Sequence, residues 1–309
     1  MPKENKYLNK IVTGDASSRL RNIESNSIDL IVTSPPYADK RKKYYGSIHP
    51  DKYVEWFTPF GEELLRILKP NGSFILNIKE HPRDGERDTY VLELILELKK
   101  MGWFWIEEYC WYKKNSFPGK WPNRFRDSWE RCLHFTKKKK FKMYQDSVKV
   151  PIGDWATKRF KSMSDKDFKR HISSTNGSLG RNVSNWIDKK KVYPHNVIVL
   201  EEERYLENSI KSLSKNKKTS NLIEFATVCF NKNHSAAFPI ELPTWFIKLF
   251  SRRGDLILDP FIGSGTTAIS AILLKRNFIG IEKNQEFSQL ARKNISELTK
   301  AIKKDAKIR

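Results

Sequence analysis

Short apolar runs and helical stripes of apolar residues follow one another along the first 136 residues. An apolar run bounded by turn residues predicts a buried strand, whereas apolar residues three and four positions apart predict a helix with one face in the core. We therefore expect strands at residues 10–13, 26–33, 73–78 and 129–136, and helices at residues 16–23, 53–68 and 88–101. Between the second helix and the third strand, Lys69-Pro70-Asn71-Gly72 predicts a turn, because proline and glycine interrupt regular structure.

The same alternation returns near the carboxyl end of the chain. It predicts strands at residues 256–259 and 277–281, and helices through 245–250, at 268–274 and from 285 onward. Strands that alternate with helices at both ends indicate one parallel, doubly wound α/β sheet built from both terminal parts. Residues 141–220 differ: they are polar, rich in Lys, Ser and Asn and weakly periodic, which indicates a separate small lobe.

The excess of basic residues indicates a negatively charged partner. The 309 residues contain 58 Lys and Arg against 36 Asp and Glu, a net charge of +22, which suits nucleic acid first and an anionic membrane surface second. A lysine-rich surface without a partner is the alternative. The three cysteines have no Cys-x-x-Cys spacing and the histidines no metal-ligand spacing, so we expect no disulfide framework and no metal site.

The first residues lack the apolar stretch of a signal peptide, and no run of about 18 apolar residues could span a membrane. We therefore expect a soluble intracellular protein.

The second predicted strand ends at Thr33-Ser34-Pro35-Pro36-Tyr37. Two consecutive prolines cannot continue a strand ladder, because each lacks an N–H group and has a nearly fixed φ. A hydroxyl group and an aromatic ring would thus lie at the carboxyl end of a strand, where open α/β sheets bind ligands. A loop that merely ends the strand is the alternative interpretation of this segment.

A glycine-rich turn follows the strand at residues 256–259, with the sequence Asp259-Pro260-Phe261-Ile262-Gly263-Ser264-Gly265-Thr266-Thr267. Glycines allow a ligand to approach the backbone closely. Glu282 ends the next strand, where a carboxylate can bind both hydroxyl groups of a ribose. The turn lacks both the Gly-Lys-Ser/Thr of a phosphate loop and the third glycine of a dinucleotide site, so a nucleoside without a pyrophosphate fits better.

Together these motifs resemble the β-group DNA amino-methyltransferases, which use S-adenosylmethionine to methylate an exocyclic amine of a base. The Ser-Pro-Pro-Tyr motif precedes the glycine-rich turn, an order that marks the β group. The remaining motifs that carry the resemblance are Gly14-Asp15, Leu68-Lys69-Pro70-Asn71-Gly72, Trp111-Tyr112-Lys113, Trp129-Glu130, Phe238-Pro239, Leu242-Pro243 and Gly280-Ile281-Glu282.

The resemblance implies a Rossmann-like, circularly permuted methyltransferase sheet with a smaller inserted target-recognition lobe. Its implied parts are a catalytic part at residues 1–140, the lobe at 141–220 and a cofactor-binding part at 221–309. The implied partners are double-stranded DNA and a cognate restriction endonuclease, and the protein would be a monomer or homodimer in a prokaryotic cytoplasm.

The resemblance also implies which residues bind S-adenosylmethionine. Glu282 would hold the ribose hydroxyls, Asp15 would lie near the adenine, and Phe238, Pro239 and Leu242 would lie beside the methionine moiety. The remaining implied cofactor residues are Thr33, Asp259, Phe261, Gly263, Ser264, Gly265, Thr266 and Thr267.

For the target base, the implied catalytic residues are Ser34, Pro35, Pro36 and Tyr37. A serine where adenine-modifying relatives usually carry Asp or Asn resembles the cytosine-N4 subgroup; an adenine-N6 enzyme and an inactive DNA-binding protein are the alternatives. Tyr37 can stack on a flipped base, and Trp111 is a candidate for its other face, with core packing as the alternative for Trp111. The candidate DNA contacts, any of which could be ordinary solvated lysines, are Lys113, Lys137, Lys138, Lys139 and Lys140.

Two other nucleic-acid chemistries are disfavoured. Carbon-5 methylation of cytosine needs a cysteine nucleophile, and no cysteine lies near the Ser-Pro-Pro-Tyr segment. A zinc deaminase needs a His-x-Glu with paired cysteines, which is absent from the sequence.

Overall fold

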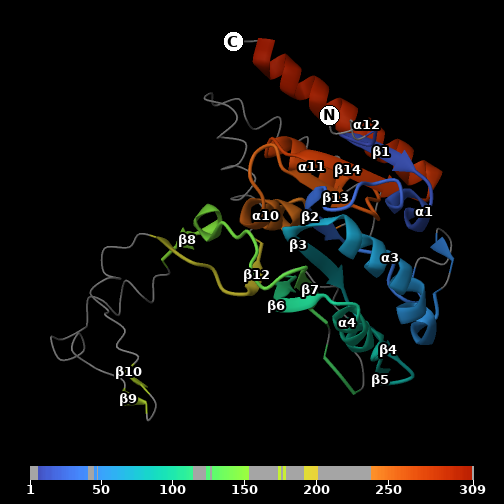
Figure 1. Ribbon diagram of the computed structural model, residues 1–309, viewed down its shortest axis with the longest axis vertical. Helices are drawn as coiled ribbons and strands as arrows, with labels where there is room; N and C mark the ends of the chain where they lie inside the picture. Colours follow the sequence, from blue (N-terminus) through green and yellow to red (C-terminus); the bar gives the residue numbers. More distant parts are fainter. Residues whose placement is uncertain are drawn as a thin grey trace. The chain divides into compact units, whose positions relative to one another are not determined.

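The computed structural model describes residues 6–40, 45–46, 48–113, 123–125, 127–152, 173–174, 177–178, 191–200 and 238–307. These residues belong to two compact units: Met1–Tyr144 with Asn196–Arg309, and Gln145–His195 (Figure 1). Within the described ranges, no helix has the length and apolar character needed to cross a membrane.

The larger unit contains an eight-stranded sheet in the order β1-β14-β13-β2-β3-β7-β6-β12. In chain order these strands are β1 (Lys10–Thr13), β2 (Ile28–Thr33), β3 (Leu68–Ile78), β6 (Phe104–Tyr112), β7 (Trp129–Thr136), β12 (Val197–Val199), β13 (Leu256–Asp259) and β14 (Asn277–Glu282). Strands from the two ends of the sequence meet at its centre, where β13 pairs with β2. The sequence prediction of an α/β sheet built from both terminal parts is therefore confirmed.

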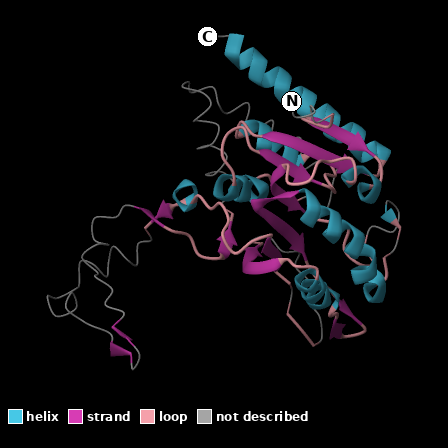
Figure 2. Cartoon of the chain, in the orientation of Figure 1, coloured by secondary structure: helices cyan, strands magenta, loops and turns pink. Residues whose placement is uncertain are grey.

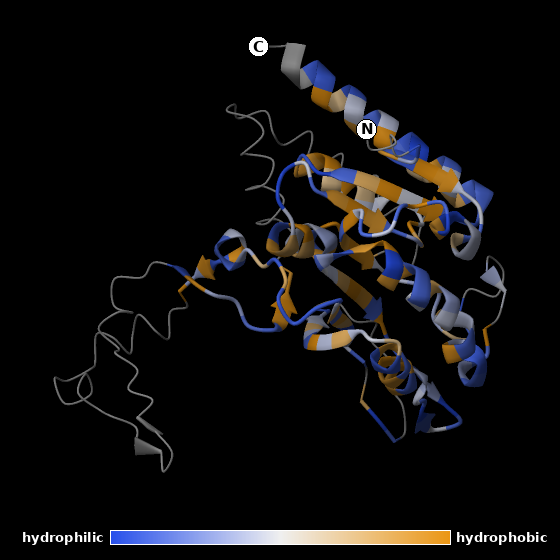
Figure 3. Cartoon of the chain, in the orientation of Figure 1, coloured by the Kyte–Doolittle hydropathy of each residue, from blue (hydrophilic) through white to orange (hydrophobic). Residues whose placement is uncertain are grey.

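Helices cover both faces of this sheet (Figure 2). One face carries three neighbouring helices, α1 (Ala16–Leu20), α3 (Tyr53–Ile67) and α4 (Tyr90–Lys100). The second layer consists of α10 (Glu241–Phe250), α11 (Thr266–Leu273) and α12 (Gln285–Lys307). Apolar residues concentrate in the central strands, whereas α12 alternates apolar and polar residues along its length (Figure 3).

Strand direction differs from the sequence prediction in one half of the sheet. The neighbours from β1 to β3 are parallel, as expected. β7, however, runs antiparallel to both β3 and β6, so the prediction of a wholly parallel sheet is wrong there. The first residues of β7 consequently lie beside the carboxyl end of β3, where Arg131 pairs with Ile78.

The predicted turn at residues 69–72 is a local irregularity within β3. Ile28 pairs with Leu68 and Leu30 pairs with Ser73, so β3 gains extra residues relative to β2. Gly72 is required there, because a Cβ atom would lie 2.7 Å from the carbonyl oxygen of Asp29. The Asp29 carboxylate accepts hydrogen bonds from Lys69 (2.7 Å) and from the backbone N–H of Leu256 (3.1 Å), so it fastens the irregularity to β13.

The smaller unit contains a short helix and two short antiparallel strand pairs. Its elements are η2 (Gln145–Val148), β8 (Val150–Pro151) with β11 (Lys191–Val192), and β9 (Ser173–Ser174) with β10 (Gly177–Ser178). β12 follows this unit in the sequence, yet it pairs with β6 in the main sheet. Part of the stretch predicted as the lobe, residues 197–199, therefore belongs to the main sheet, and residues 201–237 lie outside the described residues.

Candidate functional site

Two corners of the chain meet at the carboxyl edge of the parallel strands. We call residues 259–267 with Glu282 the glycine corner, and residues 34–37 with Asn77, Lys113 and Glu130 the proline corner. The hydroxyl group of Thr33, at the end of β2, donates a 2.6 Å hydrogen bond to Asp259 Oδ1 at the end of β13. This buried bond joins the segments that precede the two corners.

Asp259 organises the glycine corner. Its carboxylate also accepts hydrogen bonds from the Thr267 hydroxyl (2.7 Å) and from the backbone N–H of Phe261 (3.0 Å). Burial raises the pKa of Asp259 to about 6, while these donors act in the opposite direction. In this structure Thr33 and Thr267 therefore bind the Asp259 side chain, and these bonds hold the glycine-rich turn against β2 and β13.

Glu282 closes the glycine corner from the end of β14. Its carboxylate is almost fully buried and accepts backbone N–H hydrogen bonds from Gly263 (2.9 Å) and Asn284 (2.7 Å). Gly265 is the N-cap residue of α11 with a φ of 97°, and a Cβ atom there would lie 3.2 Å from the Cβ of Ala291. Glycine thus lets the turn pack against α12 while its backbone faces Glu282.

A pocket opens beside this corner between acidic and aromatic side chains. Glu282, Asp15 and Lys283 contribute the charged groups, and Phe261 and Trp56 contribute aromatic surface. The other lining residues are Ala16, Pro36, Tyr45, Ile48, Phe60 and Pro260. A ribose and a flat base match this lining, because carboxylates accept hydroxyl hydrogens and aromatic rings pack on a base.

Asp15 holds one end of the pocket. Its side chain caps α1 through hydrogen bonds from the backbone N–H (2.9 Å) and hydroxyl (2.6 Å) of Ser17, and it pairs with Lys283 at 3.2 Å. Burial alone would raise the pKa of Asp15, but the hydrogen bonds from Ser17 and the charge of Lys283 lower it. The carboxylate is therefore ionised at neutral pH.

Other predicted cofactor residues are not part of the pocket lining. Leu242 is buried in α10, and its backbone N–H bonds to the carbonyl of Pro239. Ser264 and Thr266 are buried as well, and the carbonyl of Ser264 accepts a hydrogen bond from Asn294 of α12. Of the residues predicted to bind cofactor, the pocket brings together Asp15, Phe261 and Glu282.

A buried tyrosine, Tyr53, supports the proline corner. The hydroxyl group of Tyr53, at the start of α3, donates a 2.9 Å hydrogen bond to the carbonyl of Pro36. Ser34 and Tyr37 are half-buried. The Tyr37 hydroxyl lies 3.4 Å from the Ser34 hydroxyl and donates a 2.8 Å hydrogen bond to Glu130.

Glu130 joins three strands at the proline corner. One carboxylate oxygen accepts from Tyr37 and from the side-chain amide of Asn77 on β3 (3.2 Å), and the other pairs with the Lys113 ammonium just beyond β6. Sequence reasoning missed Glu130 and Asn77 as site residues. The Trp129-Glu130 pair was visible as a motif, but only the antiparallel direction of β7 brings it to this edge.

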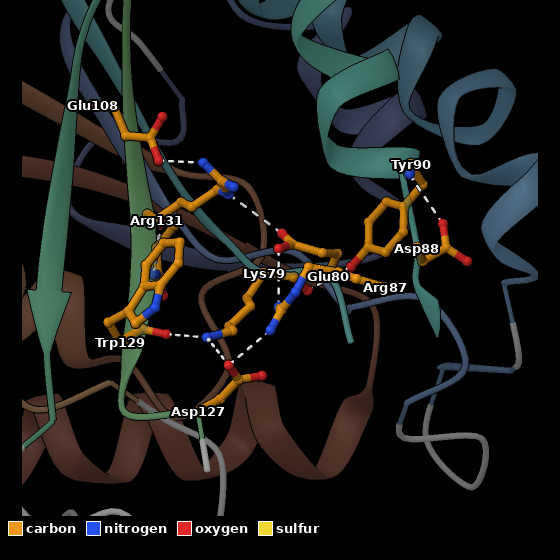
Figure 4. A network of polar contacts seen from close by, with 10 residues as sticks. Lys79, Glu80, Arg87, Asp88, Tyr90, Glu108, Asp127, Trp129 and Arg131 are labelled. Atoms are coloured by element: carbon orange, nitrogen blue, oxygen red, sulfur yellow. Dashed lines mark hydrogen bonds and ion pairs between the residues drawn. The ribbon is translucent and has the colours of Figure 1, made fainter. Parts of the chain in front are cut away.

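Charged side chains fix the chain on both sides of Glu130 (Figure 4). The Lys79 ammonium lies over the Trp129 ring, 4.5 Å from its centroid, and hydrogen-bonds to the carbonyl of Trp129. Arg131 pairs with Glu80 and Glu108. Since Lys79 and Glu80 directly follow β3, this network ties the start of β7 to the end of β3.

Trp111 and Lys113 also lie at this edge. Trp111 pairs with Glu130 across β6 and β7, is 8% exposed, and has the Lys113 ammonium 4.8 Å from a ring centroid. Most of its surface is therefore already packed within the protein.

The lysine run at residues 137–140 follows the other end of β7. Thr136 pairs with Ser73, at the ends of these strands opposite to the proline corner. The Lys137 ammonium donates hydrogen bonds to the side chain of Asn26 (2.7 Å) and to the carbonyl of Leu68 (2.9 Å). The structure thus does not bring Lys137, Lys138, Lys139 and Lys140 to the corners. No cluster of three or more His, Cys, Asp or Glu suited to a metal occurs among the described residues.

Comparisons with known proteins agree with this architecture. Residues 28–293 match the family described as DNA methylase, whose name covers N6 and N4 methyltransferases. The type II methyltransferase M.PvuII of Proteus hauseri is 27% identical over 283 residues, which cover 89% of this chain and 80% of that protein.

Solved structures with low sequence identity share the fold. The structure described as PvuII DNA methyltransferase (cytosine-N4-specific) has a TM-score of 0.64 at 22% identity, covering 96% of this chain and 91% of that one. The complex of M1.HpyAVI with SAM has a TM-score of 0.52 at 19% identity, covering 93% and 98%. With its family match over most of its length, this chain belongs to the N6 and N4 DNA methylase family.

Proposed function

We propose that this protein transfers a methyl group from S-adenosylmethionine to the exocyclic N4 amine of cytosine in double-stranded DNA. The observation that carries the proposal is the single sheet edge shared by the Glu282 pocket and the Ser-Pro-Pro-Tyr corner, joined through the Thr33–Asp259 hydrogen bond. Such an edge can hold a nucleoside cofactor and a target base side by side. Family membership and the M1.HpyAVI–SAM complex among similar folds support the choice of cofactor.

In this proposal the pocket residues bind the adenosine part of S-adenosylmethionine. Glu282 accepts hydrogen bonds from the ribose hydroxyls, and Phe261 packs against the adenine near Asp15. The turn from Asp259 to Thr267, including Gly263 and Gly265, positions its backbone for the rest of the cofactor. Phe238, Pro239 and Leu242 complete the site on the methionine side. Bound there, the cofactor supplies an electrophilic sulfonium methyl group.

The residues of the protein orient the amine of the target base toward the methyl group. The lone pair of an exocyclic amine is delocalised into the ring, so the amine is a weak nucleophile. The Ser34 hydroxyl and the Pro35 carbonyl accept the two amine hydrogens and leave the lone pair directed at the methyl group. The carbonyl of Pro36 is already occupied by Tyr53, which distinguishes it from these two acceptors.

The transfer step balances without any further reactant. The amine lone pair forms the new N–C bond while the C–S bond breaks and its electron pair returns to sulfur. The nitrogen becomes positively charged and then releases a proton to water. Fixed acceptors stabilise that developing charge, and orientation of the two reactants can lower the barrier by up to ~7–11 kcal/mol.

The target base has to leave the duplex, because its amine is unreachable within the base stack. Tyr37 offers a ring on which the flipped base can stack, worth ~1–3 kcal/mol. This gain offsets part of the unstacking cost of a few kcal/mol. Trp111 and Lys113 border the same corner and are the DNA contacts we retain at this edge.

Ser34 favours cytosine, and the cytosine-N4-specific PvuII structure with a similar fold is consistent with that choice. An adenine-N6 enzyme is the second candidate, because the family includes both chemistries. We assign target recognition to the lobe predicted at residues 141–220, and a restriction-modification system in a prokaryotic cytoplasm as the setting.

Nucleoside analysis tests this proposal directly. The protein would be incubated with unmethylated plasmid DNA and S-adenosylmethionine carrying a labelled methyl group, and the DNA hydrolysed and analysed by mass spectrometry. Labelled N4-methylcytosine is the expected product. N6-methyladenine alone would select the second candidate, and DNA binding without methyl incorporation would indicate an inactive DNA-binding protein. Single-molecule sequencing of the same DNA would locate the target motif.

A further inference from the structure

Whether the Ser34 hydroxyl can accept an amine hydrogen depends on the direction in which its own hydrogen points. A serine hydroxyl has one hydrogen and two lone pairs, so it accepts an amine hydrogen well only when its own hydrogen points elsewhere. The Tyr37 hydroxyl oxygen, at 3.4 Å, is the acceptor that the corner offers to Ser34. Tyr37 can play that part only if its own hydrogen is also directed away.

Glu130 is the nearer of two acceptors for the Tyr37 hydrogen; the other is the side-chain oxygen of Asn77, at 3.3 Å. A carboxylate has no hydrogen to donate, so the 2.8 Å bond between Tyr37 and Glu130 requires the phenol to be the donor. Burial and the negative charge of Glu130 raise the pKa of Tyr37 well above its usual value, which keeps the phenol protonated. The lone pairs of the Tyr37 oxygen then face Ser34.

The position of Glu130 is itself well determined. Lys113, just beyond β6, and Asn77, on β3, bind its carboxylate, and its side chain is 12% exposed. Trp129 and Arg131, its neighbours in the chain, are anchored by the ion-pair network that follows β3 (Figure 4). In such a shielded place, hydrogen bonds in series polarise one another.

We propose that Glu130 is a positioning residue that orients the Ser34 hydroxyl through Tyr37, so that the Ser34 oxygen presents lone pairs to the amine of the target base. The inference rests on the proposed function and adds to it a directed series of hydrogen bonds from the amine to Ser34, Tyr37 and Glu130. It gives Tyr37 a second task besides stacking, performed by its hydroxyl group.

Two substitutions separate these tasks. Tyr37→Phe keeps the ring and leaves the Glu130–Lys113 ion pair intact, while Glu130→Gln removes the charge that directs the phenol. The measurement is the single-turnover rate of methyl transfer, with saturating S-adenosylmethionine and a duplex that carries the motif located by sequencing. The loss of a hydrogen bond to a charged group predicts a rate roughly 10- to 100-fold below wild type for each variant.

Binding and base flipping should remain unchanged. The dissociation constant for the duplex, and the fluorescence of 2-aminopurine placed at the target position, are expected within about twofold of wild type for Tyr37→Phe, since the stacking ring remains. The double variant should be no slower than the slower single variant, because both substitutions interrupt the same series. Glu55→Gln, in an exposed ion pair with Lys52, is the matched control for the loss of a carboxylate and should have the wild-type rate.

Each result bears on the inference. Tyr37→Phe with a wild-type rate would overturn it, as would rate losses that multiply in the double variant. A fall in duplex affinity as large as the fall in rate would overturn it too, because it would show a role in binding alone. No methyl transfer by the wild-type protein would instead refute the proposed function, and this inference with it.

Discussion

The two corners of the site are constructed in different ways. In the glycine corner, each carboxylate accepts a hydrogen bond from within its own turn: Asp259 from Phe261 and Glu282 from Asn284, two residues away in each case. Each also accepts one from a distant hydroxyl group, Asp259 from Thr33 and Glu282 from Tyr45. In the proline corner, Tyr37 bonds to Glu130, 93 residues away. The local bonds of the glycine corner follow from a contiguous sequence motif, whereas the bond between Tyr37 and Glu130 exists only once the sheet has formed.

The largest expected effect comes from removing the proposed amine acceptor, which should slow methyl transfer without weakening cofactor binding. Ser34→Ala deletes one fixed acceptor of the transition state, so the single-turnover rate of methyl transfer should fall roughly 100- to 1000-fold. The dissociation constant for S-adenosylmethionine, measured by calorimetry, should stay within about twofold, because Ser34 does not line the pocket. An equal loss of cofactor affinity would mean that the corners do not act separately.

Glu282→Gln should produce the opposite result. The amide offers one acceptor oxygen where the carboxylate offers two, and it loses a charge-assisted hydrogen bond, worth about 1.5–3 kcal/mol. We expect S-adenosylmethionine to bind roughly 10- to 100-fold more weakly. With saturating cofactor, the methyl-transfer rate should fall no more than a few-fold. A large rate loss at saturation would contradict the division of work between the corners.

Lowering the pH should destabilise the protein through His134, in the sheet next to the proline corner. This residue lies on β7, four positions after Glu130, and burial lowers its pKa to about 3. The folded state keeps His134 neutral, while the unfolded chain protonates it below about pH 6.5. Its contribution is therefore fully present above pH 6.5, and the free energy of unfolding should fall by up to about 1.4 kcal/mol per unit as the pH decreases toward 3.

The His134→Gln variant isolates this effect, because glutamine does not titrate and can still bond to Ser73, the partner of His134. The rings that face His134 are Tyr109, Phe141 and Phe250, and none of them titrates between pH 3 and 7. Urea unfolding at several pH values would measure both proteins. Identical pH dependence of wild type and variant would contradict the prediction.

A smaller effect is expected far from both corners. Lys137→Met removes hydrogen bonds to Asn26 and Leu68 at the opposite sheet edge, so the free energy of unfolding should fall by about 1–2 kcal/mol. The exposed Lys140 is the control, and Lys140→Met should change stability by less than about 0.5 kcal/mol. A marked loss of DNA affinity for Lys137→Met, at unchanged stability, would extend the DNA surface to this edge.

Predictions from the sequence were accurate where they depend on neighbouring residues. Apolar runs predicted β1, β7 and β13 with the observed bounds, and the glycine-rich turn was recognised from neighbouring residues. The predictions failed where the result depends on pairing. The direction of β7 cannot be read from an apolar run, because the same residues pack equally well in either direction. An apolar run therefore does not point to Glu130, and it does not reveal that the lysines after Thr136 follow the end of β7 far from the proline corner.

The central pairing of β2 with β13 has a consequence for how the protein is made. β2 (residues 28–33) is synthesised long before its neighbour β13, which begins at residue 256. The middle of the sheet therefore stays incomplete until most of the chain has been synthesised. At ~5–20 residues per second, that interval lasts roughly 10–50 s. During it, one edge of β2 is open to other nascent chains, and chaperone supply becomes a determinant of yield.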